Sequence, residues 1–329
     1  MDRRNSWISS APGNYDSAVC HPVAVEGTPP PFIAHNRRIA VIYNPTAGQR
    51  KRRRYKSVMK VLGKLGVSVT ELRTGGRSDA ERLATGVRPG EFDVIAVAGG
   101  DGTINEAVNG LRADAPPLAI VPLGTANVLA AKLGLRIDPA HIAHTIARQQ
   151  PTTVHVGVVN DRKFMMMAGI GIDTHVVRDV SRTLKRLTGK GAYVWQALIE
   201  LIRFPSSAYG VTIDGVRHEA GSAIFANGHF YSGRFISVPK ARLEERSLNA
   251  CLLAGRGVWN LIRYGVALTG NRLTRLSDVS TIEFREALLN GPEGDPIHAD
   301  GEIVGRLPAI VRSHPNPLNV LCPLNGAES

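Results

Sequence analysis

Residues 92–111 read FDVIAVAGGDGTINEAVNGL, an apolar run that leads into three glycines, a carboxylate and a hydroxyl. The run predicts a buried β-strand over 92–98, and the apolar spacing after it predicts a helix from about Thr103. Glycines let the backbone come close to a ligand, and the N–H groups that open a helix bind phosphate oxygens. The stretch therefore predicts a phosphate-binding loop between a strand and a helix.

Asp101 is the acidic residue of this loop, and a carboxylate beside a phosphate needs a chemical reason. It can hold Mg²⁺, take a proton from a nucleophile, or do both. The alternative is a tight turn in which Asp101 only caps the helix. Thr103 and Glu106 are predicted near the same helix start, so the loop offers further polar groups.

Strands and helices alternate through the first half of the chain. Apolar runs at 39–43, 67–72, 92–98 and 118–122 predict strands, and each is followed by a polar or glycine-rich loop and a helix. This alternation is typical of an α/β fold whose parallel sheet binds ligands at the carboxyl ends of its strands. We expect one crevice there to collect the polar residues Asn44, Thr74, Asp101, Thr103, Thr125 and Asn127.

The second half of the chain has a different texture. Short β-like runs separated by turn residues predict an antiparallel β-sandwich over 151–323, after an α/β nucleotide-binding domain over 37–150. A helical insert is expected at 174–204, basic in its first half and apolar in its second. The insert suits either an interfacial membrane contact or a core-packing helix with a basic cap. Residues 1–36 are expected to be a flexible tail, and 324–329 a short one.

The composition sets limits on the partners. The 329 residues carry a formal charge of +12, which favours nucleic acid, anionic phospholipid or nucleotide phosphate. Aromatic residues make up 5% of the chain without an RNA-binding pattern, so nucleic acid is not expected. No apolar run reaches the ~20 residues of a membrane span. Cys20, Cys251 and Cys322 lack C-x-x-C spacing, which indicates a reducing compartment and no zinc site.

Four motifs follow one another along the chain: NPTAG at 44–48, GGDGT at 99–103, PLGTAN at 122–127 and ADGE at 299–302. Together they resemble the diacylglycerol kinase catalytic family, bacterial lipid kinases related to sphingosine kinases. The similarity runs from about Arg38 to Pro323. It implies a nucleotide-binding α/β domain followed by a lipid-binding β-sandwich. The implied reaction transfers the γ-phosphoryl group of ATP to a lipid hydroxyl with the help of Mg²⁺, and diacylglycerol, giving phosphatidic acid, is the leading acceptor.

The resemblance also implies roles for individual residues. Asp300 is the implied general base toward the lipid hydroxyl, Glu302 reaches the nucleotide or a metal, and Asp101 holds Mg²⁺. Which of Asp101 and Asp300 takes the proton stays open, and Asp300 with Gly301 also suits a plain hairpin turn. The expected nucleotide contacts are Asn44, Thr74, Gly99, Gly100, Asp101, Gly102, Thr103, Glu106, Gly124, Thr125 and Asn127.

Two positions depart from the family pattern. Arg246 stands where relatives usually carry glycine in an acidic turn, and its positive charge argues against a structural metal at Glu245. His155 stands where aspartate is common, and the sequence gives no functional account of it. No Walker-type lysine is present. The five cations at 50–54 suit phosphate neutralisation, lipid head groups or a solvated helix start.

The predicted partners are a lipid substrate and an anionic membrane surface, without nucleic acid, and a homodimer stays open. The predicted location is cytoplasmic, at the periphery of the membrane. Two rival functions remain. NAD kinases share the GGDGT loop but do not ordinarily carry the loop at 122–127, and a catalytically silent lipid-binding protein would be expected to have lost Asp101, Asp300 and Glu302.

Overall fold

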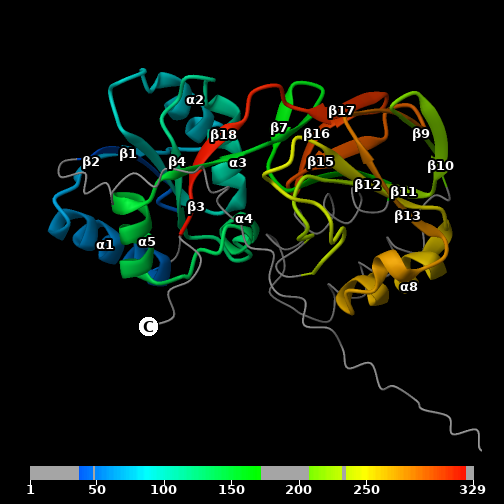
Figure 1. Ribbon diagram of the computed structural model, residues 1–329, viewed down its shortest axis with the longest axis horizontal. Helices are drawn as coiled ribbons and strands as arrows, with labels where there is room; N and C mark the ends of the chain where they lie inside the picture. The colour runs from blue at the N-terminus through cyan, green and yellow to red at the C-terminus, as the bar shows by residue number, and fades with distance from the viewer. Residues whose placement is uncertain (1–36, 47–48, 172–206, 232–234, 324–329) are drawn as a thin grey trace, which may run out of the picture.

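The computed structural model describes four stretches of the chain: 37–46, 49–171, 207–231 and 235–323. They form two lobes side by side, an α/β lobe and a β-rich lobe (Figure 1). The insert expected at 174–204 and the two expected tails lie outside the described residues. Within these stretches, no helix has the length and apolar character that crossing a bilayer requires.

The first lobe is built on a six-stranded sheet. Its strands are β1 (Arg38–Tyr43), β2 (Ser68–Arg73), β3 (Val94–Gly99), β4 (Leu118–Pro122), β5 (Pro151–Val154) and β18 (Leu318–Leu321). Its helices are α1 (Gln49–Lys64), α2 (Asp79–Gly86), α3 (Asp101–Gly110), α4 (Val128–Lys132) and α5 (Pro139–Arg148). The strand order is β2-β1-β3-β4-β18-β5, and all neighbours run parallel except β5 against β18. The predicted parallel sheet is confirmed.

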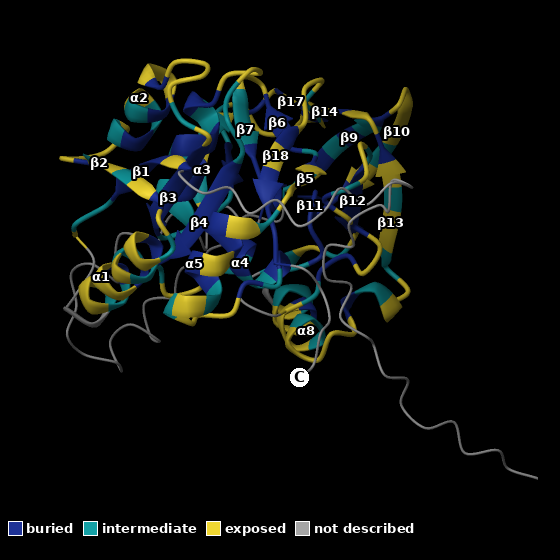
Figure 2. Cartoon of the chain, turned by 60° about the vertical axis from the view of Figure 1, so that its left-hand side comes forward, coloured by how far each residue is buried: buried dark blue, intermediate teal, exposed yellow. Residues whose placement is uncertain are grey.

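The centre of this sheet is buried on both faces (Figure 2). On β1, Ile39 and Val41 pack with residues of α1 and α5, whereas Ala40 and Ile42 pack with residues of α2 and α3. Successive side chains of a strand point to opposite faces, so a strand covered by helices on both sides must be apolar throughout. This requirement explains the continuous apolar runs in the sequence.

The first sheet also takes in two strands from the region expected to be the second domain. β18, near the end of the chain, pairs parallel with β4 through Val320 and Leu118, and it pairs antiparallel with β5. The expected division at residue 150 therefore does not coincide with the sheets. The sequence of a short strand does not reveal which distant strand it pairs with. In the structure β18 covers the edge of β4, which would otherwise present unpaired backbone groups.

The second lobe is a sandwich of two antiparallel sheets. One has the order β10-β9-β14-β17-β6-β7, and its strands are β6 (Gly157–Val159), β7 (Arg162–Phe164), β9 (Tyr209–Ile213), β10 (Val216–Ala220), β14 (Glu286–Asn290) and β17 (Ala309–Ser313). The other has the order β13-β12-β11-β8-β15-β16, and its strands are β8 (Met167–Ile170), β11 (Ser222–Ala226), β12 (Leu248–Leu253), β13 (Val279–Phe284), β15 (Pro296–Ala299) and β16 (Glu302–Arg306). One helix, α8 (Gly257–Thr269), follows β12.

The sandwich core lies between the two sheets and includes Phe164, Phe225 and Phe284. The β-like run 281–288 is divided at Arg285 between β13 and β14, which belong to different sheets. A chain that passes from one sheet to the other must bend, so one apolar run becomes two strands. The predicted fold class, an α/β domain followed by an antiparallel β-sandwich, is confirmed.

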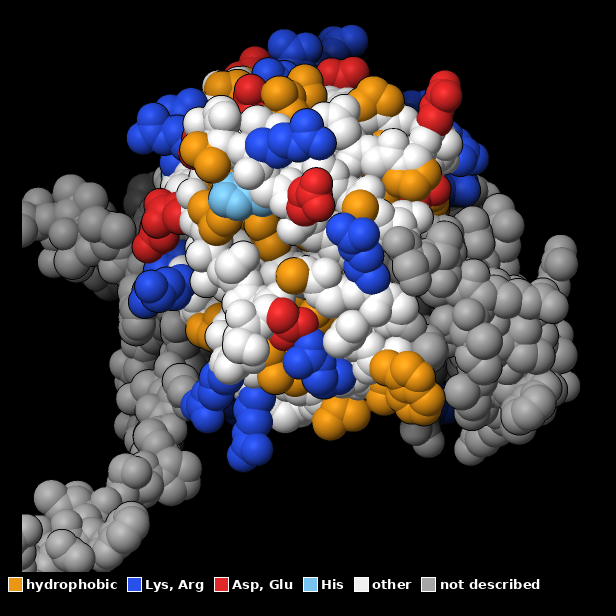
Figure 3. All heavy atoms as spheres, turned by 90° about the vertical axis from the view of Figure 1, so that its right-hand side faces the viewer, with side chains coloured by type: hydrophobic (Ala, Val, Ile, Leu, Met, Phe, Trp, Pro, Cys, Tyr) orange, Lys and Arg blue, Asp and Glu red, His pale blue; other side chains and the backbone are white. Residues whose placement is uncertain are grey.

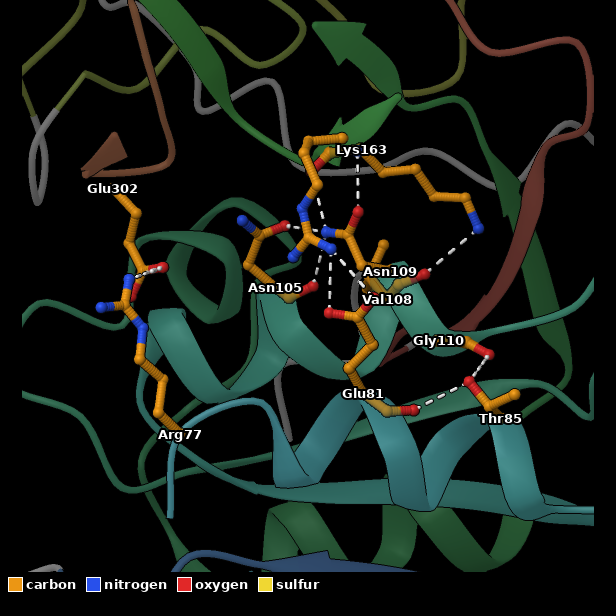
Figure 4. Close-up of polar contacts among 10 residues, drawn as sticks. Arg77, Glu81, Thr85, Asn105, Val108, Asn109, Gly110, Lys163 and Glu302 are labelled. Carbon is orange, nitrogen blue, oxygen red and sulfur yellow. Dashed lines mark hydrogen bonds and ion pairs between the residues drawn. The ribbon is translucent and has the colours of Figure 1, made fainter. Parts of the chain in front are cut away.

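Polar contacts join β7 of the sandwich to the C-terminal end of α3 (Figure 4). Asn109 Nδ2 donates to the carbonyl of Lys163 at 3.0 Å, and the Lys163 N–H donates back to Asn109 Oδ1 at 2.8 Å. Lys163 Nζ donates to the carbonyl of Leu111 at 2.9 Å, where a cation also favours the negative end of the helix dipole. Arg162 reaches both carboxylate oxygens of Glu81 at 2.9 Å.

A buried lysine–histidine pair forms a second bridge between the lobes. Lys132, at the end of α4, is 2% exposed, and its Nζ lies 3.0 Å from Nδ1 of His229, which follows β11. Burial, reinforced by the Lys132 charge, lowers the pKa of His229 to about 4. The imidazole is therefore neutral at pH 7, and its Nδ1 accepts the hydrogen bond, because an ammonium can only donate.

This bridge predicts a pH-dependent stability. Between about pH 6.5, the value for an unfolded histidine, and about pH 4, the unfolded chain binds more protons at His229 than the native protein does. The free energy of unfolding should fall as pH drops through this window, by on the order of 3 kcal/mol in total. His229→Gln should flatten this dependence in urea titrations, whereas His144→Gln, at an exposed position on α5, should not. An unaltered slope in His229→Gln would contradict the assignment.

Candidate active site

The loops after β1, β3 and β4 meet at one edge of the parallel sheet. Asn44, directly after β1, donates from Nδ2 to Thr103 Oγ1 at 2.9 Å, and its N–H donates to the carbonyl of Ala98 at 2.9 Å. The N–H of Leu123, directly after β4, donates to the carbonyl of Gly99 at 2.8 Å. The structure therefore ties the NPTAG, GGDGT and PLGTAN motifs together through direct hydrogen bonds.

Glycines allow these loops to touch backbone to backbone. A Cβ on Gly124 would lie 2.8 Å from the Gly100 Cα and 2.7 Å from Asn127 Oδ1, and a Cβ on Gly99 would lie 2.5 Å from the Cβ of Thr103. Asn127 takes the left-handed conformation, with φ 48°, at the start of α4, and its Nδ2 donates to the carbonyl of Gly124 at 3.1 Å. Any larger residue at Gly124 would push the two loops apart.

Asp101 is the first residue of α3, so the helix begins two residues earlier than the sequence predicted. Its Oδ1 is buried without a hydrogen-bond partner. Burial raises the pKa of the carboxyl, and the backbone N–H groups of Leu129, Val128 and Asn127, at the start of α4, oppose part of that rise. A buried carboxylate oxygen without a donor suits a hard cation. Among the described residues no three His, Cys, Asp or Glu side chains form a metal-binding group, so phosphate and water oxygens would have to complete the coordination.

Asp300 occupies the turn between β15 and β16. Its φ of 47° and the φ of 84° at Gly301 are those of a tight Asp-Gly hairpin turn. Its carboxylate accepts the N–H groups of Met165, Met166 and Met167, at 2.6, 2.9 and 3.0 Å. The sequence left two alternatives for Asp300, a hairpin turn or an acidic site residue. In the structure both hold, because the turn residue also carries a buried carboxylate.

Two opposing effects act on the Asp300 carboxyl. Burial raises its pKa and the Met165–Met167 N–H groups lower it, while the negative charge of Asp101 raises it further. Desolvation dominates, and the net direction is upward. The effect of Asp101 also shows that the two carboxyl groups, from different lobes, lie within electrostatic reach of each other.

Glu302 extends from the same turn over the start of α3. A Cβ on Gly102 would lie 3.5 Å from Glu302 Oε1. The Glu302 carboxylate also lies 3.6 Å from the guanidinium of Arg77, whose side chain is 79% exposed against 42% for Glu302. Figure 4 shows this pair. The ADGE turn of the sandwich lobe is therefore brought onto the GGDGT loop of the α/β lobe.

The other expected residues differ in how they sit. Thr74 is buried at the end of β2, and its N–H donates to the carbonyl of Tyr43 at 3.0 Å. Glu106 is partly buried on α3, and Thr125 is exposed on the loop before α4. The Thr125 side chain is therefore accessible to a ligand. Thr74 is buried, and its backbone hydrogen bond holds the loop after β2 against β1.

The position considered for a structural metal does not fit a cation. Glu245 is exposed and lies 3.8 Å from Arg242, and the charge of Arg246 acts on His155. Burial and that charge together lower the pKa of His155. Arg242 and Arg246 therefore bring positive charge to the position at which a metal would need anionic ligands. The two departures from the family pattern, His155 and Arg246, are thus electrostatic neighbours.

Sequence reasoning missed several groups at or near this edge. Arg77 follows Gly75 and Gly76 in the loop after β2. Its position at the carboxyl edge of the predicted sheet could have identified it as a candidate site residue. Arg54, within the basic run, donates to the carbonyl of Pro122 at 2.9 Å, so this cation supports a loop. The Met165–Met167 N–H groups had no signal, because backbone donors are the same in every sequence.

Comparison with known families agrees with this geometry. The model described as diacylglycerol kinase catalytic domain matches residues 38–159, and the one described as YegS C-terminal NAD kinase beta sandwich-like domain matches residues 166–322. The chain therefore carries a region similar to the diacylglycerol kinase catalytic domain, followed by one similar to the YegS C-terminal domain, which confirms the resemblance that the four motifs predicted. It is an enzyme of the kinase class, as the motifs predicted.

Relatives and solved structures extend the comparison over most of the chain. A diacylglycerol kinase of Bacillus subtilis is 29% identical over 89% of this chain and 98% of its own length, and one of Staphylococcus carnosus is 27% identical over 83% and 91%. A crystal structure of a putative diacylglycerol kinase from Bacillus anthracis has a TM-score of 0.73 at 22% identity, over 87% of this chain and 95% of that one. This structural likeness supports the two-lobed fold.

The contact between Gly100 and Gly124 predicts a strong effect of a single methyl group. Gly124→Ala should weaken binding of a nucleoside triphosphate by about tenfold or more, because the two loops must separate to admit the Cβ. Gly63→Ala is the matched control, since nothing lies within 4 Å of a Cβ at that position on α1. Calorimetric titration measures both. Equal affinities in the two variants would show that the glycine contact does not shape the nucleotide site.

Proposed function

We propose that this kinase transfers the γ-phosphoryl group of ATP to a lipid hydroxyl, with diacylglycerol as the acceptor and phosphatidic acid as the product. The observation that carries the proposal is the meeting of two carboxyl-bearing segments, the Asp300–Glu302 turn and the Asp101 loop, at the glycine-lined edge of the parallel sheet. The names of the relatives from Bacillus subtilis and Staphylococcus carnosus support the choice of acceptor.

The α/β lobe supplies the nucleotide side of the site in this proposal. The glycines of the GGDGT loop let the backbone come close to phosphates, and the N-terminal end of α3 would present backbone N–H groups to them, whereas the first N–H groups of α4 bond to Asp101. The hydrogen bond between Asn44 and Thr103 holds the first loop against the helix start. A divalent cation beside Asp101 would offset the charge that develops on the transferring group.

The sandwich lobe supplies the acceptor side. The lipid hydroxyl oxygen forms a bond to the γ-phosphorus, the bond from that phosphorus to the bridging oxygen of ADP breaks, and the hydroxyl proton passes to a carboxylate. Asp300 Oδ2 accepts one N–H and Oδ1 accepts two, so Oδ2 keeps a lone pair for that proton. The upward direction of its pKa favours a base near neutral pH. Asp101, whose pKa burial also raises, is the alternative base.

A second candidate acceptor is a soluble dinucleotide. The C-terminal half matches a domain described as NAD kinase beta sandwich-like, so phosphorylation of NAD has a specific observation in its favour. The two candidates share the donor site and differ in the acceptor. We further propose that the enzyme works in the cytoplasm at the membrane periphery, where a lipid acceptor would be found.

The function is tested by phosphoryl transfer from ATP to a panel of acceptors. Diacylglycerol in mixed micelles should be the preferred acceptor over sphingoid bases, phosphatidylglycerol and NAD. Transfer to NAD alone would replace the proposal with the second candidate, and no transfer to any acceptor would favour a silent lipid-binding protein.

The same assay tests the two carboxylates. Asp101→Asn should abolish transfer, and Asp300→Asn should lower turnover by roughly 10²–10⁴-fold, the usual worth of a general base. Asp114→Asn, at an exposed position paired with Arg112, is the matched control and should behave as wild type. Near-normal turnover in Asp300→Asn would remove this residue from proton transfer and leave Asp101 as the base.

The pKa of Asp300 also predicts a pH profile. A base must be deprotonated, so kcat/KM should fall as the pH drops through the raised pKa of this carboxyl, above the ~3.9 of an ordinary aspartate. The measurement is kcat/KM against pH, with circular dichroism to establish that the protein stays folded. A rate that stays constant down to about pH 4 would contradict a base with a raised pKa.

A further inference from the structure

The helix α8 lies on the outside of the sandwich and is held there by one side of its surface. Tyr264 is buried against residues of the neighbouring sheet, including Cys251 and Leu253. Its hydroxyl accepts the N–H of Gly255 at 2.7 Å and donates to the carboxylate of Asp278. These contacts fix both the position and the rotation of the helix.

The opposite side of α8 is apolar and faces solvent. Trp259 is 80% exposed, Ile262 40% and Val266 67%, and their spacing of three and four residues places them along one stripe. Phe235 is also exposed, and the N–H of the next residue, Ile236, donates at 2.9 Å to Oδ1 of Asn271, two residues after the end of α8. We call these four exposed side chains, Trp259, Ile262, Val266 and Phe235, the α8 patch.

Arginines flank the residues of the α8 patch in the sequence. The segment 254–277 contains four arginines and no Asp or Glu: Arg256, Arg263, Arg272 and Arg275. Arg263 lies 5.1 Å from the centre of the Tyr264 ring and pairs with Asp278, while Arg256 lies 3.6 Å from Glu219. All four arginine side chains are exposed. Figure 3 shows hydrophobic and basic side chains together along the lower edge of this face, where α8 lies in Figure 1.

We propose that α8 is the surface by which this kinase docks on an anionic phospholipid bilayer. A helix with an exposed tryptophan, aliphatic neighbours and flanking arginines suits the boundary between head groups and acyl chains, with guanidinium groups at the lipid phosphates. Thirteen residues make a helix of about 20 Å, too short to span, so α8 lies along the surface. The choice of a membrane rests on the proposed function, because a lipid acceptor is presented there.

A second copy of the chain suits this surface less well. An isologous contact would bring the arginines of both copies together, and like charges that face each other across an interface oppose association. Four side chains are also few beside the roughly 20–30 residues that each partner contributes to a stable interface. Anionic lipid, in contrast, complements both the apolar stripe and its charge.

Vesicle binding by the full chain tests the proposal. The probe is vesicles of phosphatidylcholine with phosphatidylserine, compared with pure phosphatidylcholine, in sedimentation at low and high salt. Trp259→Ala and Val266→Ala should each weaken binding to the anionic vesicles, the first by about tenfold. Val216→Ala is the matched control, since this valine is 60% exposed on β10, outside the α8 patch. Arg272→Gln should reduce the preference for anionic vesicles.

A second readout follows Trp259 itself. In a variant with Trp7→Phe and Trp195→Phe, the remaining tryptophan, Trp259, should shift its emission to shorter wavelength when anionic vesicles are added. An unchanged emission, or equal vesicle binding by Trp259→Ala and wild type, would overturn the proposal. A dimer that Trp259→Ala dissociates, seen by light scattering without lipid, would overturn it in favour of a second copy.

The catalytic assay separates this proposal from the proposed function. With a short-chain, water-soluble diacylglycerol and no vesicles, Trp259→Ala should turn over as wild type does. Loss of preference for vesicle-borne substrate, with soluble turnover intact, is the expected outcome. If wild type fails on every lipid acceptor yet Trp259 still enters vesicles, the proposed function fails and the docking surface stands.

Discussion

The Asp300 carboxylate holds together the parts on which the site depends. Three successive N–H groups, from Met165 to Met167, converge on it, and its own N–H donates to the carbonyl of Met167 at 2.9 Å. A buried carboxylate would be costly without such donors. The hairpin turn is thereby fixed to the start of β8, and Glu302, two residues on, is fixed over the first turn of α3. The three N–H donors offset the cost of burying the charge. The geometry that they impose also suits phosphoryl transfer.

Helix α3 is the element that both lobes share. Its first residue, Asp101, faces the turn of the sandwich, and its last turn is held by Asn109 and by the ammonium of Lys163. A helix contacted at both ends by the second lobe cannot shift without moving the glycine loop at its start. The lobes are further joined by the chain that leads from β17 in the sandwich to β18 in the first sheet, and by the buried Lys132–His229 pair.

Local patterns in the sequence were enough to predict the first half of the fold. The run before Gly99 is apolar because β3 is covered on both faces. Its sequence pattern alone therefore indicates that the strand is buried. The strand β18 is short and contains an exposed asparagine, its partner β4 lies some 200 residues earlier, and nothing local encodes that pairing. In the site, Asp101 and Asp300 stand out as carboxylates beside glycines, whereas the backbone donors that hold Asp300 have no residue type to reveal them. On α8 both faces are apolar, so periodicity alone could not tell which side packs on the sheet.

The central claim is that carboxylates from the two lobes form one site. The direct measurement is the pKa of Asp300, followed by NMR of its carboxyl resonance in the wild type and in Asp101→Asn. Because a neighbouring negative charge raises the pKa of a carboxyl, its removal should lower the pKa of Asp300 while the fold and the Met165–Met167 hydrogen bonds persist. An Asp300 pKa that is the same in both proteins would mean that the two carboxylates do not face each other, and the account of a shared site would be wrong.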